Sequence, residues 1–331
     1  MRGAGALAVL TLALLAAASG CTNTAQEPVV LEVVPAGSLL YPFEHIERAF
    51  ESEHPGIDVR LEGHGSIQAV RQVTDLHRDV DVVAVADASL IPDMMFRPME
   101  DGEGNYTDTY RTFATNEMVI AYTDRSAYAD EITAENWYTI LARPDVRVGF
   151  SNPMLDACGY RALMVTALAE EHYEAPGIFA AIIGDAFTPS LTMTREDGVR
   201  TITLPALLKP SSEKVAIRDG SIYLLSLIDA GGIDYAFEYR SVADEHGLLQ
   251  IDLPPEIDLS DAAFADTYRS VVVKLGFRRF SSVGDTRVGQ PIVYAVTVPA
   301  TAEHPEEAAS FVAFVLDAFT ESRDGWPQPL E

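Results

Sequence analysis

Two short turns that carry serine hydroxyls stand near the start of the region expected to fold. Gly37 and Ser38 follow an apolar run of β character, and Gly65 and Ser66 follow a second such run. Each turn also precedes a segment with helical spacing, so a hydroxyl and the free backbone N–H groups of a helix N-terminus could face one anion. The two turns therefore predict a site for a small anion.

Composition limits what else the chain can be. With 331 residues and 48% hydrophobic content, the chain can bury large cores, and its length favours two globular lobes. Its 50 acidic and 23 basic residues give a formal net charge of −27, which argues against binding to nucleic acid or to an anionic membrane surface. This charge repels anions at long range, so an anion site must rely on local hydroxyls, amides and helix ends.

The first residues read as an export signal. Arg2 precedes the apolar stretch 4–18, which is too short to span a bilayer comfortably. The small residues before Cys21 resemble a lipobox, without its usual leucine, so we expect Cys21 to carry lipid and residues 22–28 to form a tether. A plain cleaved signal or an uncleaved anchor are the alternatives. With Cys21 modified, Cys158 has no disulfide partner. The sequon at Asn105 is a candidate glycan acceptor.

Strand and helix patterns alternate along the chain. Their order predicts right-handed crossovers, with ligands beyond the carboxyl ends of the strands. The expected strands are Val29–Pro35, Ile57–Glu62, Asp79–Asp87, Glu117–Thr123, Val146–Phe150, Val215–Arg218, Ile233–Tyr239, Ser270–Leu275 and Pro291–Val298. The expected helices are Leu40–Glu53, Ile67–Leu76, Trp137–Arg143, Gly159–His172, Pro176–Gly184, Ile222–Ala230 and Pro305–Phe319. Asp197 and Gly198 predict a hairpin turn within 191–204.

The pattern indicates a chain that builds one α/β lobe, builds a second, and returns to the first. We expect residues 1–28 to be signal and tether, residues 29–118 and 293–325 to form lobe 1, and residues 119–292 to form lobe 2. Residues 326–331 are expected to be a polar tail. The strands expected at 117–123 and 291–298 would lie at the hinge.

Six segments together carry a resemblance to a known family. They are AGSLLYPFEHIERAFESEHP, GHGSIQAVRQV, DVDVVAVADASLIP, TNEMVIAYT, SNPMLDACGYRALM and GGIDYAFEYRSVADEHGL. In this order they resemble the archaeal-type tungstate/molybdate-binding proteins of ABC importers, from about Val29 to Ala318. The resemblance implies a type II periplasmic-binding-protein fold, in which two mainly parallel sheets flanked by helices close on an oxyanion.

The resemblance also implies a transport role. The chain would capture tungstate or molybdate outside the membrane and deliver it to a permease with its ATPase subunits, as a monomer and without a cofactor. A sulfate or phosphate receptor of the same fold is the alternative. No histidine metal motif, nucleophile elbow or phosphate-binding loop suggests an enzyme.

Lobe 1 is expected to contribute three of the residues that the resemblance implies at the site. Gly37 would permit close backbone approach, and Ser38 and Ser66 would donate hydroxyl hydrogen bonds. The alternative for each serine is an ordinary helix N-cap, which satisfies N–H groups of its own helix.

Lobe 2 is expected to contribute Asp156, Ala157 and Cys158. By resemblance, the Asp156 carboxylate approaches the metal itself, and the other two lend backbone contacts. A bare carboxylate beside a dianion is unfavourable unless it bonds to the metal or is protonated. Asp156 could also cap the helix that follows it, and Cys158 reads as a buried thiol rather than a side-chain ligand.

By resemblance, Tyr239 matches the family's oxyanion-binding tyrosine. A phenol suits this role because it donates a hydrogen bond without adding charge. Core packing is its alternative role. Arg240 is the only cation nearby in the sequence, and it could pair with Glu238 instead of reaching the ligand.

The chain departs from the family at Ser221, which occupies the position of a glutamate that gives the metal a second carboxylate. We therefore expect a more nearly tetrahedral oxyanion, held chiefly by hydrogen-bond donors. Glu213 and Glu238 are acidic residues that could substitute for the lost carboxylate, although neither is in register.

Overall fold

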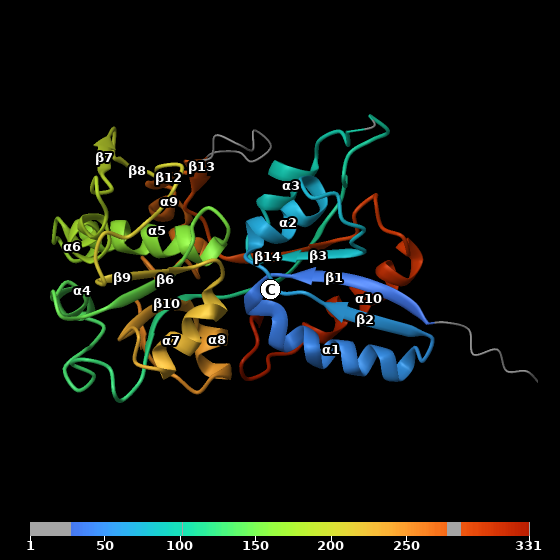
Figure 1. Ribbon diagram of the computed structural model, residues 1–331, viewed down its shortest axis with the longest axis horizontal. Helices are drawn as coiled ribbons and strands as arrows, with labels where there is room; N and C mark the ends of the chain where they lie inside the picture. Colours follow the sequence, from blue (N-terminus) through green and yellow to red (C-terminus); the bar gives the residue numbers. More distant parts are fainter. Residues whose placement is uncertain (1–27, 101, 277–285, 331) are drawn as a thin grey trace, which may run out of the picture.

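The computed structural model describes residues 28–100, 102–276 and 286–330, so Cys21 and the expected export signal lie outside the described residues. The strands gather into two groups, which we call lobe 1 and lobe 2, lying on the right and left of Figure 1. Over the described ranges, no helix combines the length and apolar character needed to cross a membrane.

Lobe 1 is built on a six-stranded sheet in the order β15-β4-β14-β3-β1-β2. Its strands are β1 (Val29–Pro35), β2 (Ile57–Leu61), β3 (Val82–Val85), β4 (Arg111–Thr115), β14 (Val293–Thr297) and β15 (Gln328–Pro329). Its helices are α1 (Leu40–Glu53), α2 (Ser66–Thr74), α3 (Leu90–Met95) and α10 (Pro305–Ala318), with the short 3₁₀ helix η1 (Gly37–Leu39). Helices α2 and α3 lie above the sheet in Figure 1, and α1 lies below it.

Lobe 2 contains a five-stranded sheet in the order β11-β5-β10-β6-β9 and a four-stranded sheet in the order β13-β12-β8-β7. The strands are β5 (Met118–Tyr122), β6 (Val148–Ser151), β7 (Met193–Glu196), β8 (Val199–Thr203), β9 (Val215–Arg218), β10 (Tyr235–Tyr239), β11 (Leu249–Asp252), β12 (Val271–Lys274) and β13 (Thr286–Val288). The helices are α4 (Trp137–Leu141), α5 (Ala157–His172), α6 (Ile178–Ile182), α7 (Leu225–Asp229), α8 (Arg240–Glu245) and α9 (Ala265–Tyr268), with 3₁₀ helices η2 (Gly184–Ala186), η3 (Ser221–Leu224) and η4 (Ala262–Phe264).

The local signals in the sequence explain several of these elements. Helix α1 occupies the range expected from its spacing, and it buries Phe43, Ile46 and Phe50. The hairpin of β7 and β8 is confirmed, because Asp197 and Gly198 both adopt the positive φ angles that its two-residue turn requires.

Helix α5 is buried along nearly its whole length. It contacts β6 and β10 of the five-stranded sheet as well as β12 of the four-stranded sheet. A helix covered on both sides needs no polar face, so residues 162–169 are apolar except for Thr166. The four-stranded sheet itself was not predicted.

Each main sheet is mixed rather than mainly parallel. β1 pairs in parallel with β2 and β3, whereas β14 runs antiparallel to β3 and β4. β6 pairs in parallel with β9 and β10, whereas β5 runs antiparallel to β10 and β11. The antiparallel strands β5 and β14 follow the two crossings of the chain between the sheets, at residues 116–117 and 289–292.

The end of the chain is not a polar tail. Trp326 is buried, and its ring packs against Phe319 at 5.1 Å between centroids. β15 then pairs antiparallel with β4 and completes one edge of the lobe 1 sheet. The sequence pattern missed this pairing because its partner lies more than two hundred residues earlier in the chain.

Candidate functional site

The two predicted serines lie buried in lobe 1 and do not cap their own helices. Ser66 is the first residue of α2, and its hydroxyl accepts a hydrogen bond from the amide of Ala86 at 3.0 Å. The Ser38 hydroxyl lies 2.9 Å from the hydroxyl of Tyr294. Because a hydroxyl has one donor and two acceptor positions, the Ser66 hydroxyl keeps its proton available for another partner.

Gly37 lies where the two lobes approach each other closely, and its own amide is already used. The Gly37 amide donates to the carbonyl of His64 at 2.8 Å, within lobe 1. A Cβ at this position would lie 3.3 Å from the side chain of Ile222 in lobe 2, so a larger residue would press on the facing lobe. The structure therefore supports a packing role for Gly37 between the lobes.

Asp156 lies where the two lobes meet. It occupies the N-cap position of α5, yet its carboxylate makes no capping hydrogen bond to that helix. Instead the carboxylate accepts from the amide of Ser66 in lobe 1 at 3.4 Å and from the amide of Ser221 in lobe 2 at 3.1 Å. Burial raises the pKa of Asp156, and the Ser151 side chain and the amides of Ser221 and Ser66 act in the opposite direction. One carboxylate thus links backbone donors of both lobes.

The residues after Asp156 are buried as well. Ala157 is the first residue of α5, and the Cys158 thiol donates to Oε2 of Glu238 at 3.4 Å and to the carbonyl of Phe237 at 3.5 Å. Burial raises the pKa of Cys158 well above its ordinary value, so this thiol stays neutral. Its contacts fit the predicted buried thiol.

Tyr239 ends β10, and a cation that the sequence analysis overlooked lies beside it. Nη1 of Arg161 donates to the Tyr239 hydroxyl and to the carbonyl of Ala86 in lobe 1, at 2.7 Å in both cases. Arg161 is only 1% exposed. The guanidinium therefore joins the tyrosine of lobe 2 to the backbone of lobe 1.

Arg240 does not form the pair with Glu238 that the sequence analysis considered for it. It pairs with Glu117 and, at 2.7 Å, with Asp252, whose side chain is mostly exposed. It makes no ion pair with Glu238 in the part of the chain that the structure describes, and Glu238 itself is fully buried.

Asp87 gives Arg161 a counter-charge from lobe 1. Its Oδ2 lies 3.8 Å from Nη2 of Arg161 and accepts a hydrogen bond from the Tyr160 hydroxyl at 2.5 Å. Burial alone would raise the pKa of Asp87, but Arg161 and Tyr160 hold it below its ordinary value. Burial acts to lower the pKa of Arg161, and Tyr239 and Asp87 raise it above its ordinary value. Both groups therefore remain charged.

Two members of this site, Arg161 and Tyr294, were missed by the sequence analysis. Tyr294 accepts a hydrogen bond from the Asn116 side chain at 3.1 Å and lies beside Tyr239, with 6.2 Å between ring centroids. The sequence did contain a signal for Arg161, since it is a lone cation inside the apolar run of α5. A charge in such a helix must be paired, and that requirement marks a functional or structural ion pair.

The lobes touch most closely at Gly65. A Cβ at Gly65 would overlap the carbonyl oxygen of Leu155, which also accepts from the amide of Gln68 at 3.0 Å. We predict that Gly65→Ala keeps the lobes folded but weakens closure, reducing ligand affinity by about tenfold or more. Gly63→Ala is the matched control, because its Cβ would meet only the Leu40 side chain at 3.4 Å. Equal affinities of the two variants, measured by titration calorimetry, would contradict this role.

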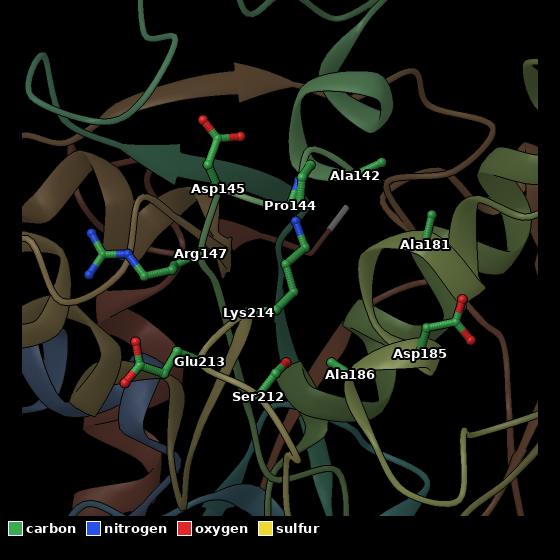
Figure 2. A pocket seen from close by; sticks show the side chains of 10 residues that line it. All are labelled: Ala142, Pro144, Asp145, Arg147, Ala181, Asp185, Ala186, Ser212, Glu213 and Lys214. Atoms are coloured by element: carbon green, nitrogen blue, oxygen red, sulfur yellow. The ribbon is translucent and has the colours of Figure 1, made fainter.

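A cavity of about 580 Å³ lies elsewhere in lobe 2 (Figure 2). Its lining includes Arg147 and Lys214, which precede β6 and β9, so it sits at the amino ends of these parallel strands. Lys214 donates to the carbonyls of Leu141, Arg143 and Val146, and its ammonium thereby closes the end of α4. Asp156 and Tyr239 lie at the carboxyl ends of the strands, where ligands of such folds bind.

Comparison with known proteins identifies the family. A family model described as bacterial extracellular solute-binding protein matches residues 31–320. The chain belongs to this family. An uncharacterized solute-binding protein of Methanoculleus marisnigri is 44% identical over 93% of this chain and 88% of its own length. The molybdate/tungstate-binding protein WtpA of Thermococcus kodakarensis is 41% identical over 96% of this chain and 88% of its own length.

Solved structures support the fold of this solute-binding protein. The periplasmic molybdate-binding protein of Azotobacter vinelandii matches with a TM-score of 0.53 and 13% identity, over 87% of this chain and 96% of that chain. The fructose-6-phosphate-bound AfuA of Actinobacillus pleuropneumoniae matches with a TM-score of 0.52 and 11% identity, over 92% of this chain and 84% of that chain. Both share the two-lobed fold and, at these identities, show the fold alone.

Proposed function

We propose that this solute-binding protein captures tungstate or molybdate between its two lobes and delivers the ion to the permease of an ABC importer. The observation that carries the proposal is the convergence of donors from both lobes on the Asp156 carboxylate. An anion bound there would contact both lobes at once, and would therefore stabilise the closed arrangement over an open one.

Relatives support the choice of ion. The proteins of Thermococcus kodakarensis and Pyrococcus abyssi that are named molybdate/tungstate-binding are each 41% identical to this chain, over 96% and 94% of its length. The match therefore includes the strands and helix ends that carry the candidate residues. At this level of identity, a shared ligand class is the simplest explanation for a shared site.

Each candidate residue has a specific role in the proposed complex. The hydroxyls of Ser38, Ser66 and Tyr239 donate to the oxygens of the ion, and the Ser221 hydroxyl does the same in place of the family's glutamate. Arg161 adds a positive charge, and its Nη2 can donate to the ion because it has no hydrogen-bond partner within the described ranges.

The remaining candidates complete the cradle. Asp156 approaches the metal centre through a carboxylate oxygen. Gly37 lets the backbone lie close to the ion. Ala157 and Cys158 contribute backbone groups at the start of α5. All of these groups bind and orient the ion, and none is asked to carry out a reaction.

The rest of the transport system follows from this role. The chain acts as a monomeric receptor rather than an enzyme, and a permease with its ATPase subunits takes the ion from it. Lipid on Cys21 would hold the receptor at the outer face of the cell membrane, with residues 22–28 as the tether.

Thermal unfolding of the purified protein tests the proposal. Tungstate or molybdate at about one hundred times its dissociation constant should stabilise the folded protein by about 2.7 kcal/mol and raise the midpoint by several degrees. Sulfate and phosphate at the same concentration should have little effect. A midpoint that rises with sulfate or phosphate but not with tungstate would overturn the choice of ligand.

The two lobe 1 serines give the first mutational test. We predict that Ser38→Ala together with Ser66→Ala weakens tungstate binding by at least about tenfold, because each substitution removes a hydrogen bond to a charged group. The fold should survive, as judged by circular dichroism. Unchanged affinity in calorimetry would remove these hydroxyls from the site.

A further inference from the structure

Position 221 holds a serine where the family has a glutamate, and a buried glutamate, Glu238, lies nearby. Glu238 lies on β10, next to Tyr239, and its side chain is 0% exposed. A fully buried glutamate needs either a charged partner or a function. No cation forms an ion pair with it among the residues that the structure describes.

The two carboxyl oxygens of Glu238 have different surroundings. Oε2 is held by the amide of Tyr239 at 3.0 Å and by the thiol of Cys158 at 3.4 Å. Oε1 is buried and has no hydrogen-bond partner in the described part of the chain. Leaving a buried polar atom unpaired costs about 1–3 kcal/mol, so one oxygen is anchored while the other is available to a ligand.

Glu238 is also next to the residue that departs from the family. The Ser221 hydroxyl lies within hydrogen-bonding reach of the Glu238 carboxyl and acts to lower its pKa, against the larger effect of burial, although Oε1 itself has no hydrogen-bond partner in the described part of the chain. The Ser221 amide in turn donates to Asp156 at 3.1 Å. Ser221 is thus a neighbour of both carboxyl groups, and its side chain is smaller than the glutamate of the family.

We propose that Glu238 supplies the second carboxylate to the metal centre of the bound oxyanion, in place of the glutamate absent at position 221. This inference rests on the proposed function. One oxygen of Asp156 and one of Glu238 each donate a lone pair to the metal, whose oxidation state does not change, and any proton on Glu238 leaves to solvent. Six oxygens then surround the metal, rather than the tetrahedral four expected from Ser221 alone.

Glu213, the other acidic residue considered as a substitute, is excluded by its position. It is exposed and lines the cavity at the amino ends of β6 and β9, where Figure 2 shows it beside Ser212. That end of the sheet is opposite to the end that carries Asp156 and Tyr239. Glu213→Gln therefore serves as a matched control.

The inference is tested by removing the carboxylate at position 238 and by restoring one at position 221. In calorimetry with sodium tungstate, Glu238→Gln should bind at least about tenfold more weakly than the wild type, whereas Glu213→Gln should bind equally well. The double variant Ser221→Glu/Glu238→Gln returns a carboxylate to the family position and should recover most of the lost affinity. Affinity of Glu238→Gln within about twofold of the wild type would overturn the inference. If the double variant bound tungstate no more tightly than Glu238→Gln, the loss would be due to packing, and the inference would also be overturned.

X-ray absorption at the tungsten L3 edge measures the number of oxygen neighbours of the metal, which would not change if Glu238 served only in packing. The wild type should show about six oxygen neighbours and Glu238→Gln fewer, whereas about four in the wild type would contradict the inference. A wild type that takes up no tungstate would instead count against the proposed function, so the two failures are distinguishable.

Discussion

Replacing Arg161 with methionine is expected to lower the free energy of unfolding by about 3–5 kcal/mol, because it removes one partner of a buried ion pair. The remaining carboxylate of Asp87 would stay buried without its cation, and the carbonyl of Ala86 and the hydroxyl of Tyr239 would each lose a hydrogen bond. Urea unfolding followed by circular dichroism measures the change.

The same substitution should weaken tungstate binding by at least about tenfold, since a charge-assisted donor is lost from the site. Arg240→Met is the matched control, because the ion pairs of Arg240 with Glu117 and Asp252 are partly exposed and contribute at most about 1 kcal/mol. If the two variants lost similar stability and affinity, Arg161 would neither stabilise the fold through its buried ion pair nor contribute a donor to the bound ion.

The second large effect is a pH dependence of stability that Glu238 causes. Burial raises the pKa of Glu238 from 4.5 to about 8. Between these values the folded protein holds a proton that the unfolded chain releases, so the free energy of unfolding falls as pH rises. The slope is about 1.4 kcal/mol per pH unit for this one group.

Glu238→Gln should remove this contribution. The variant should therefore gain stability relative to the wild type as the pH is raised from 5 to 8, by several kcal/mol in total. Burial also raises the pKa of Asp156, and that of Asp258 to about 6, but both groups are present in both proteins. The difference between the two unfolding curves isolates Glu238, and a difference that stays constant with pH would contradict its buried, proton-holding state.

The sequence predicted those helices and hairpins that are determined by residues within their own segment. The spacing of Phe43, Ile46 and Phe50 was sufficient for α1, and two turn residues were sufficient for the hairpin of β7 and β8. It could not predict β15, because that strand depends on the free edge of β4, which lies far away in the chain.

The site shows the same limit. The resemblance indicated Ser38, Ser66, Asp156, Ser221 and Tyr239, and the structure brings these residues together across the two lobes. It did not indicate Arg161, whose partners Ala86 and Tyr239 lie 75 and 78 positions away. A lone charge in an apolar helix shows that some partner exists, but only the structure, which places Arg161 beside Ala86 and Tyr239, shows which one.

Titration calorimetry of the purified protein with sodium tungstate tests the central claim most directly. We predict a single transition that saturates at about one ion per chain and that prior addition of molybdate, but not of sulfate, abolishes. Absence of heat with both tungstate and molybdate, together with saturable binding of sulfate or phosphate, would contradict the proposed ligand.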